Sequence, residues 1–134
     1  MDKDFELLLN RAKELANIVH LNDYVTYGHV ACAILSDSSE VYTGLCVNSK
    51  CSLGNCAEQA AIMEMLQRHE HIIKKLVVYS YKGCVYIPCG KCREFMKMLD
   101  MNNMSAQILM PDYSVLRLAD LLPFPFVSSE GSII

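Results

Sequence analysis

Two short motifs hold the residues whose types and spacing could do chemistry. They are Cys56-Ala57-Glu58 and Pro88-Cys89-Gly90-Lys91-Cys92, about thirty residues apart. Two thiolates three residues apart can face one metal ion from a single helical turn, and Cys56 can supply a third sulfur. Three protein ligands leave the fourth position of a tetrahedral zinc ion open for water, as a catalytic zinc requires. The spacing predicts one Zn²⁺ per subunit, bound by Cys56, Cys89 and Cys92.

Glu58 follows Cys56 by two residues and is the predicted catalytic residue. A carboxylate in that position can approach a water molecule on the metal without occupying a ligand position, so it can carry protons. A glutamate in the first turn of a helix is also favoured by the helix dipole alone. Its position relative to Cys56 favours the catalytic interpretation.

Other interpretations of the same cysteines remain open. Cys89-Gly90-Lys91-Cys92 taken alone fits a thioredoxin-type redox pair as well as a metal site, and Cys56 with Glu58 favours metal. A closed structural zinc site would need a fourth ligand, for which Cys51 or Cys84 could serve. The alternative from another class is therefore a non-catalytic zinc module or a redox protein. The odd total of seven cysteines favours metal or catalytic use over disulfides.

The elements that must position these residues follow from hydrophobic periodicity. We expect helices and strands in the order α, β, β, α, β, α, β, which predicts an α/β fold with a mixed sheet and helices on its faces. Cys56 and Cys89 then lie at helix N termini, where free N–H groups and partial positive charge stabilise thiolates. The predicted helices cover residues 5–20, 55–69, 91–101 and a turn at 118–122. The predicted strands cover 30–35, 41–47, 76–81, 85–87 and 107–110, with 113–116 as an extension of the last strand or a further strand.

The motifs C-A-E and P-C-G-x-C-R, with the tail Leu121–Phe126, are similar to those of the cytidine deaminase family in its small three-cysteine form. The resemblance implies a three-layer sandwich and zinc-dependent hydrolytic deamination of a free cytosine-type nucleoside. It also implies a homotetramer in which a terminal aromatic residue, here Phe126, reaches into a neighbouring subunit's base pocket. A backbone N–H near Ala57 would anchor the ring.

The chain departs from that family at the substrate positions. Counting back from the zinc motif, Leu45 and Val47 stand where members that act on cytidine carry the asparagine and glutamate that hold the ribose. Asn48 is the polar residue left in that set. Gly28 stands in place of a pocket aromatic, and its neighbour His29 is a candidate substrate contact.

Gln59 replaces an arginine that follows C-A-E in the family. Blasticidin S deaminase is a member that also lacks this arginine. The alternative substrate is therefore a modified aminopyrimidine nucleoside such as blasticidin S.

Length, composition and charge limit the remaining possibilities. The 134 residues predict a single deaminase domain, 1–134, with a core at about 5–126 and a tail at 127–134; residues 128–134 show no readable role. With a net charge of −3 and interspersed charges, no basic face is expected for a nucleic-acid polymer. No apolar stretch approaches the roughly 18–20 residues of a membrane span, and the charged start argues against a secretion signal. We expect a soluble, cytoplasmic protein.

Overall fold

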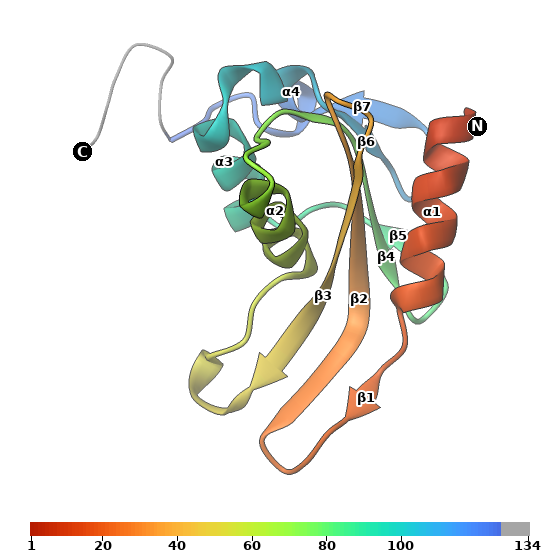
Figure 1. Ribbon diagram of the computed structural model, residues 1–134, viewed down its shortest axis with the longest axis vertical. Coiled ribbons are helices and arrows are strands. Elements are labelled where there is room, and N and C mark those ends of the chain that lie inside the picture. The colour runs from red at the N-terminus through yellow and green to blue at the C-terminus, as the bar shows by residue number, and fades with distance from the viewer. Residues whose placement is uncertain (127–134) are drawn as a thin grey trace.

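The computed structural model describes residues 1–126, and its helices and strands alternate largely as the periodicity predicts (Figure 1). The predicted tail, 127–134, lies outside the described residues. The helices are α1 (Lys3–Leu15), α2 (Ala57–Gln67), α3 (Gly90–Leu99) and α4 (Leu118–Leu121), with short 3-10 helices η1 (Lys50–Ser52) and η2 (Met101–Ser105). The strands are β1 (Val19–His20), β2 (Val25–Ser36), β3 (Val41–Ser49), β4 (Ile73–Ser80), β5 (Cys84–Tyr86), β6 (Gln107–Leu109) and β7 (Val115–Arg117).

The strands form one mixed sheet. Its main path runs β3, β2, β4, β6, β7, while β1 pairs with the first residues of β2 and β5 pairs with the last residues of β4. The pairing of β4 with β6 is parallel and the other pairings are antiparallel. The predicted hairpin is confirmed, with Cys32 opposite Gly44.

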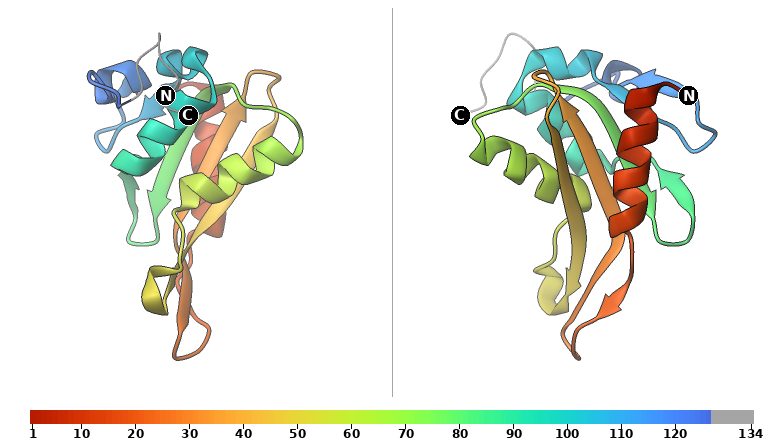
Figure 2. Two further views of the ribbon diagram at one scale, coloured as in Figure 1. Left: turned by 90° about the vertical axis from the view of Figure 1, so that its left-hand side faces the viewer. Right: turned by 45° about the vertical axis from the view of Figure 1, so that its right-hand side comes forward.

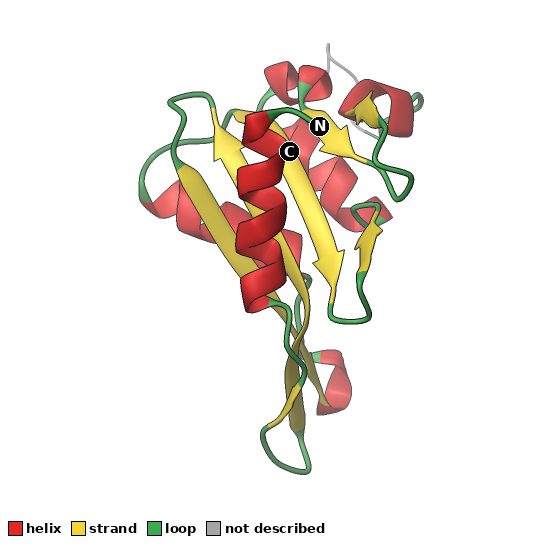
Figure 3. Cartoon of the chain, turned by 90° about the vertical axis from the view of Figure 1, so that its right-hand side faces the viewer, coloured by secondary structure: helices red, strands yellow, loops and turns green. Residues whose placement is uncertain are grey.

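The sheet is covered by helices on both faces, because its central strand alternates apolar residues between them. Cys32 and Ile34 of β2 belong to the core cluster formed with α2 and α3, whereas Ala31, Ala33 and Leu35 belong to the cluster formed with α1. Figures 1 and 3 show α1 on one side of the sheet and α2 and α3 on the other. The predicted three-layer α/β sandwich is confirmed.

The first helix is shorter than predicted. It ends at Leu15, because Ala16 leaves helical geometry with ψ 81°, and Val19–His20 instead pairs with β2. Its start is earlier than predicted, since the Asp2 side chain accepts a hydrogen bond from the Phe5 N–H at 2.8 Å and caps the first turn. The prediction of a helix to His20 was wrong because strand pairing satisfies the backbone groups of Val19–His20 better than one more helical turn.

The backbones of helix α2 and strand β3 approach each other closely at Gly44. A Cβ added to Gly44 of β3 would fall 2.3 Å from the Ala61 nitrogen and 2.5 Å from the Ala57 carbonyl oxygen. Beyond the other end of α2, Tyr42 and Ser38 donate hydrogen bonds to the Glu70 carboxylate. The helix that begins at the zinc motif is thus held to the hairpin along its length.

The lower ends of β2 and β3, with β1 and η1, project beyond the helices (Figure 2). In residues 1–126, no helix has the length and apolar character needed to cross a bilayer.

Candidate active site and metal centre

Two helix N termini meet on one face of the sheet. Cys56 is the N-cap residue of α2 and Cys89 that of α3, and both have extended backbone, with ψ of 150° and 160°. Neither thiol caps the N–H groups of its own helix. Those N–H groups and the positive end of each helix dipole therefore remain available to negative charge.

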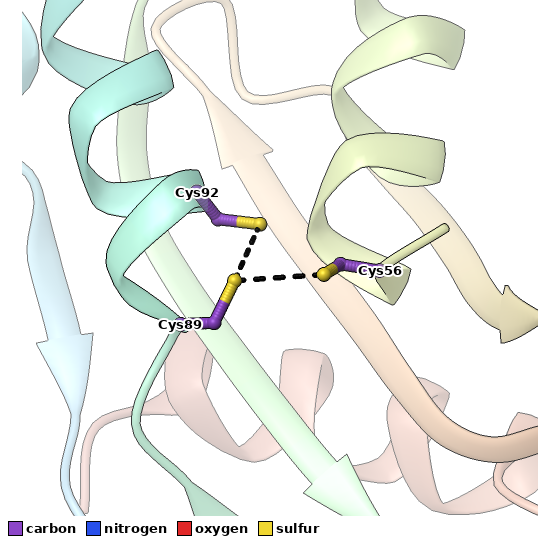
Figure 4. A group of neighbouring side chains, drawn as sticks. All are labelled: Cys56, Cys89 and Cys92. Atoms are coloured by element: carbon purple, nitrogen blue, oxygen red, sulfur yellow. Dashed lines mark hydrogen bonds between the residues drawn. The ribbon is translucent and has the colours of Figure 1, made fainter. Parts of the chain in front are cut away.

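Three sulfur atoms gather at these helix starts, as Figure 4 shows. The Sγ of Cys89 lies 3.5 Å from that of Cys56 and 3.1 Å from that of Cys92, and all three lie within 4.8 Å of one another. These distances are far longer than the roughly 2.05 Å of a disulfide bond. They are close to about 3.8 Å, the distance between two sulfur atoms in a tetrahedral site whose Zn–S bonds are about 2.3 Å long. The donor set therefore matches zinc.

The electrostatics of the cluster also call for a cation. Burial raises the pKa of the Cys92 thiol well above its usual range, and the hydrogen bond with Cys89 and the charge of Glu58 raise it further. Burial likewise raises the pKa of Cys56, with a further contribution from Cys89. A bound metal dication reverses this balance, because coordination deprotonates thiols outright.

Among residues 1–126, the cluster has three members and not four. Cys51 and Cys84, the candidates for a fourth ligand, are exposed and stand outside it. A tetrahedral zinc ion held by three protein ligands keeps one position for water, which distinguishes a catalytic site from a closed structural one.

Glu58 lies beside the three-cysteine cluster. Its side chain is buried, with 4% exposed, although it lies in the first turn of α2. One carboxylate oxygen, Oε2, accepts a hydrogen bond of 3.0 Å from the backbone N–H of Cys89. This bond joins the start of α2 to the start of α3 and fixes the carboxylate beside the sulfur cluster.

A cleft of about 500 Å³ opens over these helix starts. We call it the active-site cleft; its lining includes Cys56, Cys89, Glu58 and Ala57 at one end and residues 46–49 of β3 at the other. The volume is within the range of small-ligand pockets. A small molecule in this cleft would contact both Glu58 and the open side of the metal cluster.

Comparison with known proteins agrees with this geometry. The sequence profile described as the cytidine and deoxycytidylate deaminase zinc-binding region matches residues 3–107. The chain belongs to this deaminase family. A cytidine deaminase of Sporosarcina psychrophila is 30% identical over 114 residues, which cover 81% of this chain and 84% of that protein.

Solved structures of deaminases match the fold. The cytidine deaminase of Mycobacterium tuberculosis superposes with a TM-score of 0.78 at 28% identity, covering 95% of this chain and all of that one. The cytidine deaminase of Mycobacterium leprae shares the fold, with a TM-score of 0.76 at 21% identity, over 92% of this chain and 100% of its own. The chain is a zinc-dependent hydrolytic deaminase with a three-cysteine zinc site.

Three of the four predicted substrate residues line the deaminase cleft. They are His29, Asn48 and Ala57. The fourth, Phe126, lies outside the lining and is 73% exposed. Its backbone N–H donates a hydrogen bond of 2.8 Å to Oε1 of Glu94, which ties the tail to α3. Within one copy of the chain, the structure does not bring Phe126 to the cleft.

The structure corrects the position of Leu45. This side chain packs in the cluster formed with α1, on the sheet face opposite the cleft, so it does not occupy a sugar-binding position. Cys46 lines the cleft instead, and its Sγ accepts a hydrogen bond from the Val30 N–H at 3.2 Å. Val47, the other position found by counting back from Cys56, does line the cleft, so the two counted positions differ in the side to which they contribute. Alternation along the strand, counted from buried Tyr42, could have found Cys46.

Gly28 is explained by its backbone. It has φ +82°, and a Cβ there would lie 2.2 Å from the carbonyl oxygen of Asn17. Position 28 therefore cannot carry an aromatic side chain in this backbone. Tyr86 and Ile87, which sequence reasoning did not select, line the cleft and supply apolar contact from the β5 side.

Proposed function

We propose that this deaminase converts a free cytosine-type nucleoside, cytidine or deoxycytidine, to the uracil nucleoside and ammonia. The position of Glu58 carries the proposal, because its buried carboxylate is fixed beside the three sulfurs and lines the cleft. Hydrolytic removal of an amine needs a proton carrier within reach of the attacking water and of the leaving nitrogen. The relatives in Sporosarcina and Mycobacterium are named cytidine deaminases, which supports a cytosine ring.

Each element of the site has a role in this reaction. Zinc bound by the three cysteines supplies a Lewis acid that activates water. Glu58 takes a proton from the attacking water and delivers it to the ring nitrogen beside the amine-bearing carbon. It then carries the proton of the newly bonded hydroxyl group to the amine, which leaves as ammonia. The N–H of Ala57, at the first position of α2, has no partner within the helix and donates to the carbonyl oxygen of the ring.

The two helix N termini balance the charge of the site. Three thiolates and one Zn²⁺ sum to a net charge of −1, which opposes the ionisation of water. The positive ends of α2 and α3 offset this charge. Arg93 adds to the effect, because its Nη1 donates to the Pro88 carbonyl at 3.2 Å and so keeps the guanidinium at the start of α3.

The end of the active-site cleft formed by residues 46–49, which we call the sugar end, offers contacts to the sugar of the substrate. Asn48 offers an amide to a sugar hydroxyl, and His29 offers a ring nitrogen. Phe126 would act in a neighbouring subunit's cleft, which requires an oligomer, and the resemblance to the family implies a homotetramer. Its exposed ring and the 92% exposure of Phe124 support such a contact between copies, because large aromatic side chains left in water favour burial in an interface.

A second candidate substrate is a modified aminopyrimidine nucleoside such as blasticidin S. Glu58 is the single carboxylate among the described residues that line the cleft. No acidic side chain is therefore left to accept hydrogen bonds from two ribose hydroxyls. This observation favours a substrate whose sugar differs from ribose.

The decisive experiment measures ammonia release by the zinc-loaded protein with cytidine, deoxycytidine and blasticidin S in parallel. The Glu58→Gln variant is the blank, since it keeps the side-chain volume but cannot carry protons. We expect turnover of at least one compound by the wild-type chain alone. Equal ammonia release by Glu58→Gln would refute the mechanism, and turnover of blasticidin S alone would select the second substrate.

We propose that the chain acts as one deaminase domain in the cytoplasm, with a small-molecule nucleoside and copies of itself as partners. The match over residues 3–107 and a cleft formed within one sheet and its helices support a single domain. The net charge of −3 supports the exclusion of a nucleic-acid polymer.

A further inference from the structure

The last described residues after α4 form a short aromatic segment. We call residues 123–126, with the sequence Pro-Phe-Pro-Phe, the aromatic tail. Leu122, which precedes it, is buried, whereas Phe124 and Phe126 are 92% and 73% exposed. Proline fixes φ near −65° and has no backbone N–H. The aromatic tail therefore has few conformations, and only its two phenylalanines carry backbone N–H groups that could attach it to the protein.

One hydrogen bond attaches the aromatic tail to the helix that carries two of the zinc ligands. The Phe126 N–H donates to Oε1 of Glu94, 2.8 Å away, so the chain returns from α4 to α3 (Figure 1). Glu94 lies two residues after Cys92 on that helix. Its other carboxylate oxygen, Oε2, is buried and has no hydrogen-bond partner among residues 1–126. Within the described part of the chain, the bond to Phe126 is thus the hydrogen bond that holds this carboxylate. We call it the tail bond.

The charge and burial of Glu94 favour the tail bond. A hydrogen bond with an ionised acceptor is stronger than one between neutral groups. A carboxylate that is shielded from water and has lost its hydrogen-bond partner is also costly. Both effects favour an attached aromatic tail over a free one.

The tail bond fixes the backbone of Phe126 and leaves its ring free. The donor is the main-chain N–H, so the side chain takes no part in the bond and remains largely in solvent. The ring does not line the cleft of its own copy. A ring carried on a fixed backbone loses less conformational entropy on entering another copy's cleft than a ring on a free segment does.

We propose that Glu94 is a positioning residue, which holds the Phe126 backbone on α3 so that the ring is presented to the cleft of a neighbouring copy. The inference rests on the proposed role of Phe126 in that cleft. Glu94 does not line the cleft, so it acts on substrate binding through Phe126 and not on the reaction itself.

The first test reads the aromatic tail without using activity. The chain contains no tryptophan, so Phe126→Trp provides a single fluorescent reporter at the end of the aromatic tail. We expect the fluorescence anisotropy of this reporter to fall when Glu94→Ala is added. Glu94→Gln should restore most of the anisotropy, because its amide oxygen can accept the same hydrogen bond. Equal anisotropy with and without Glu94→Ala would overturn the proposal.

The second test separates KM from kcat in the zinc-loaded full chain with the best substrate. We expect Glu94→Ala to raise KM about tenfold, as loss of one hydrogen bond to a charged group does, with kcat and bound zinc unchanged. Glu94→Gln should recover most of the affinity. The matched control is Glu14→Ala, which removes an exposed glutamate of α1 on the other face of the sheet and should leave KM unchanged. A fall in kcat or in bound zinc with KM unchanged would overturn the positioning role.

A double-mutant cycle tests whether Glu94 acts through Phe126. Phe126→Ala should raise KM by itself, and adding Glu94→Ala should then cause no further rise, because residues that act through one another are not additive. A further tenfold rise in the double variant would overturn the proposal.

Failure of the proposed function can be distinguished from failure of this inference. If the wild-type chain turns over no nucleoside, the proposed deamination fails, and the anisotropy of the Phe126→Trp reporter alone decides whether Glu94 holds the aromatic tail. If turnover is normal but neither Phe126→Ala nor Glu94→Ala changes KM, deamination stands and the positioning role is overturned.

Discussion

The metal end and the sugar end of the cleft are built in different ways. At the metal end, Cys56, Cys89 and Glu58 occupy the starts of two regular helices, and one hydrogen bond joins those starts. At the sugar end, β2 changes register between Tyr27 and Ala31, and η1 contains residues in the left-handed region, Cys51 with φ 59° among them. One end is built on regular helices, whereas the other is built on irregular segments.

This difference separates chemistry from specificity. Helix starts fix the direction of a side chain within the first turn, so ligand and proton carrier keep the geometry that the reaction requires. In the proposed reaction, the irregular segments would contact the sugar and so set which sugar fits. Variants at matched positions of the two ends can test this division.

The largest contrast is expected between two buried cysteines. Cys92→Ala removes a ligand at the metal end, and we expect loss of bound zinc and of all turnover. Cys46→Ala removes a thiol at the sugar end, and we expect zinc to remain at one ion per chain. Atomic absorption on the purified proteins measures both. Loss of zinc from Cys46→Ala would mean that the metal set extends to the sugar end.

The next contrast compares rate with affinity. Glu58→Gln should lower kcat by about 10²–10⁴-fold, because proton transfer contributes that much, while zinc stays bound. Asn48→Ala should instead raise KM, by about tenfold, with little change in kcat, because it removes a hydrogen bond to the sugar. Steady-state kinetics with the best substrate distinguishes the two patterns. A fall in kcat of the same size for both variants would contradict the division.

Gly44→Ala should affect both the metal end and the sugar end of the cleft, because Gly44 lies where α2 packs against β3. Its new Cβ would be 2.3 Å from the Ala61 backbone nitrogen, and the helix must move away from the strand. We expect a loss of about 1–3 kcal/mol in the free energy of unfolding, measured by urea titration. Gly90→Ala is the control, since its Cβ would meet only Arg93 Nη2, at 3.8 Å. Equal stability of both variants would show that α2 is not held as closely as described.

The smallest effect is expected at Tyr42, which lies at the start of β3, far along the strand from Asn48. The hydrogen bond to Glu70, followed by burial, raises the pKa of the Tyr42 phenol from 10.0 to about 12. A raised pKa means that folding favours the protonated phenol, so this contribution is complete below pH 10 and is lost as the pH rises toward 12. Tyr42→Phe should lack this alkaline decline in thermal stability and keep normal kinetics. A decline of equal size in Tyr42→Phe would refute the assignment.

The sequence alone predicts the metal end well for a physical reason. Motif spacing of two and three residues, placed at the start of strong helical periodicity, leaves few geometries open, and Cys56, Cys89 and Cys92 come together as expected. The sugar end depends on features that local patterns do not encode. Leu45, a position found by counting back from Cys56, packs on the α1 side of the sheet, and strand pairing rather than residue type sets which side of β3 faces the cleft.

Tertiary pairing explains the other misses. Val19–His20 continues the helical period of the first segment, yet it forms β1 because Tyr27 and Thr26 of β2 are beside it. Position 28 is glycine because the carbonyl oxygen of Asn17 occupies the space of a Cβ. Such constraints come from segments that are distant in sequence or joined by irregular turns.

The hydrogen bond between Glu58 and the Cys89 N–H has a consequence for protein engineering. The aim of the carboxylate depends on the backbone of a segment 31 residues further along the chain. A hybrid enzyme assembled from two relatives should therefore inherit residues 56–58 and 88–93 from the same parent. A crossover point between those segments would take Glu58 from one parent and the Cys89 backbone from the other, so the hydrogen bond between them would no longer join matched segments. Exchange of residues 45–54 should instead change substrate preference alone.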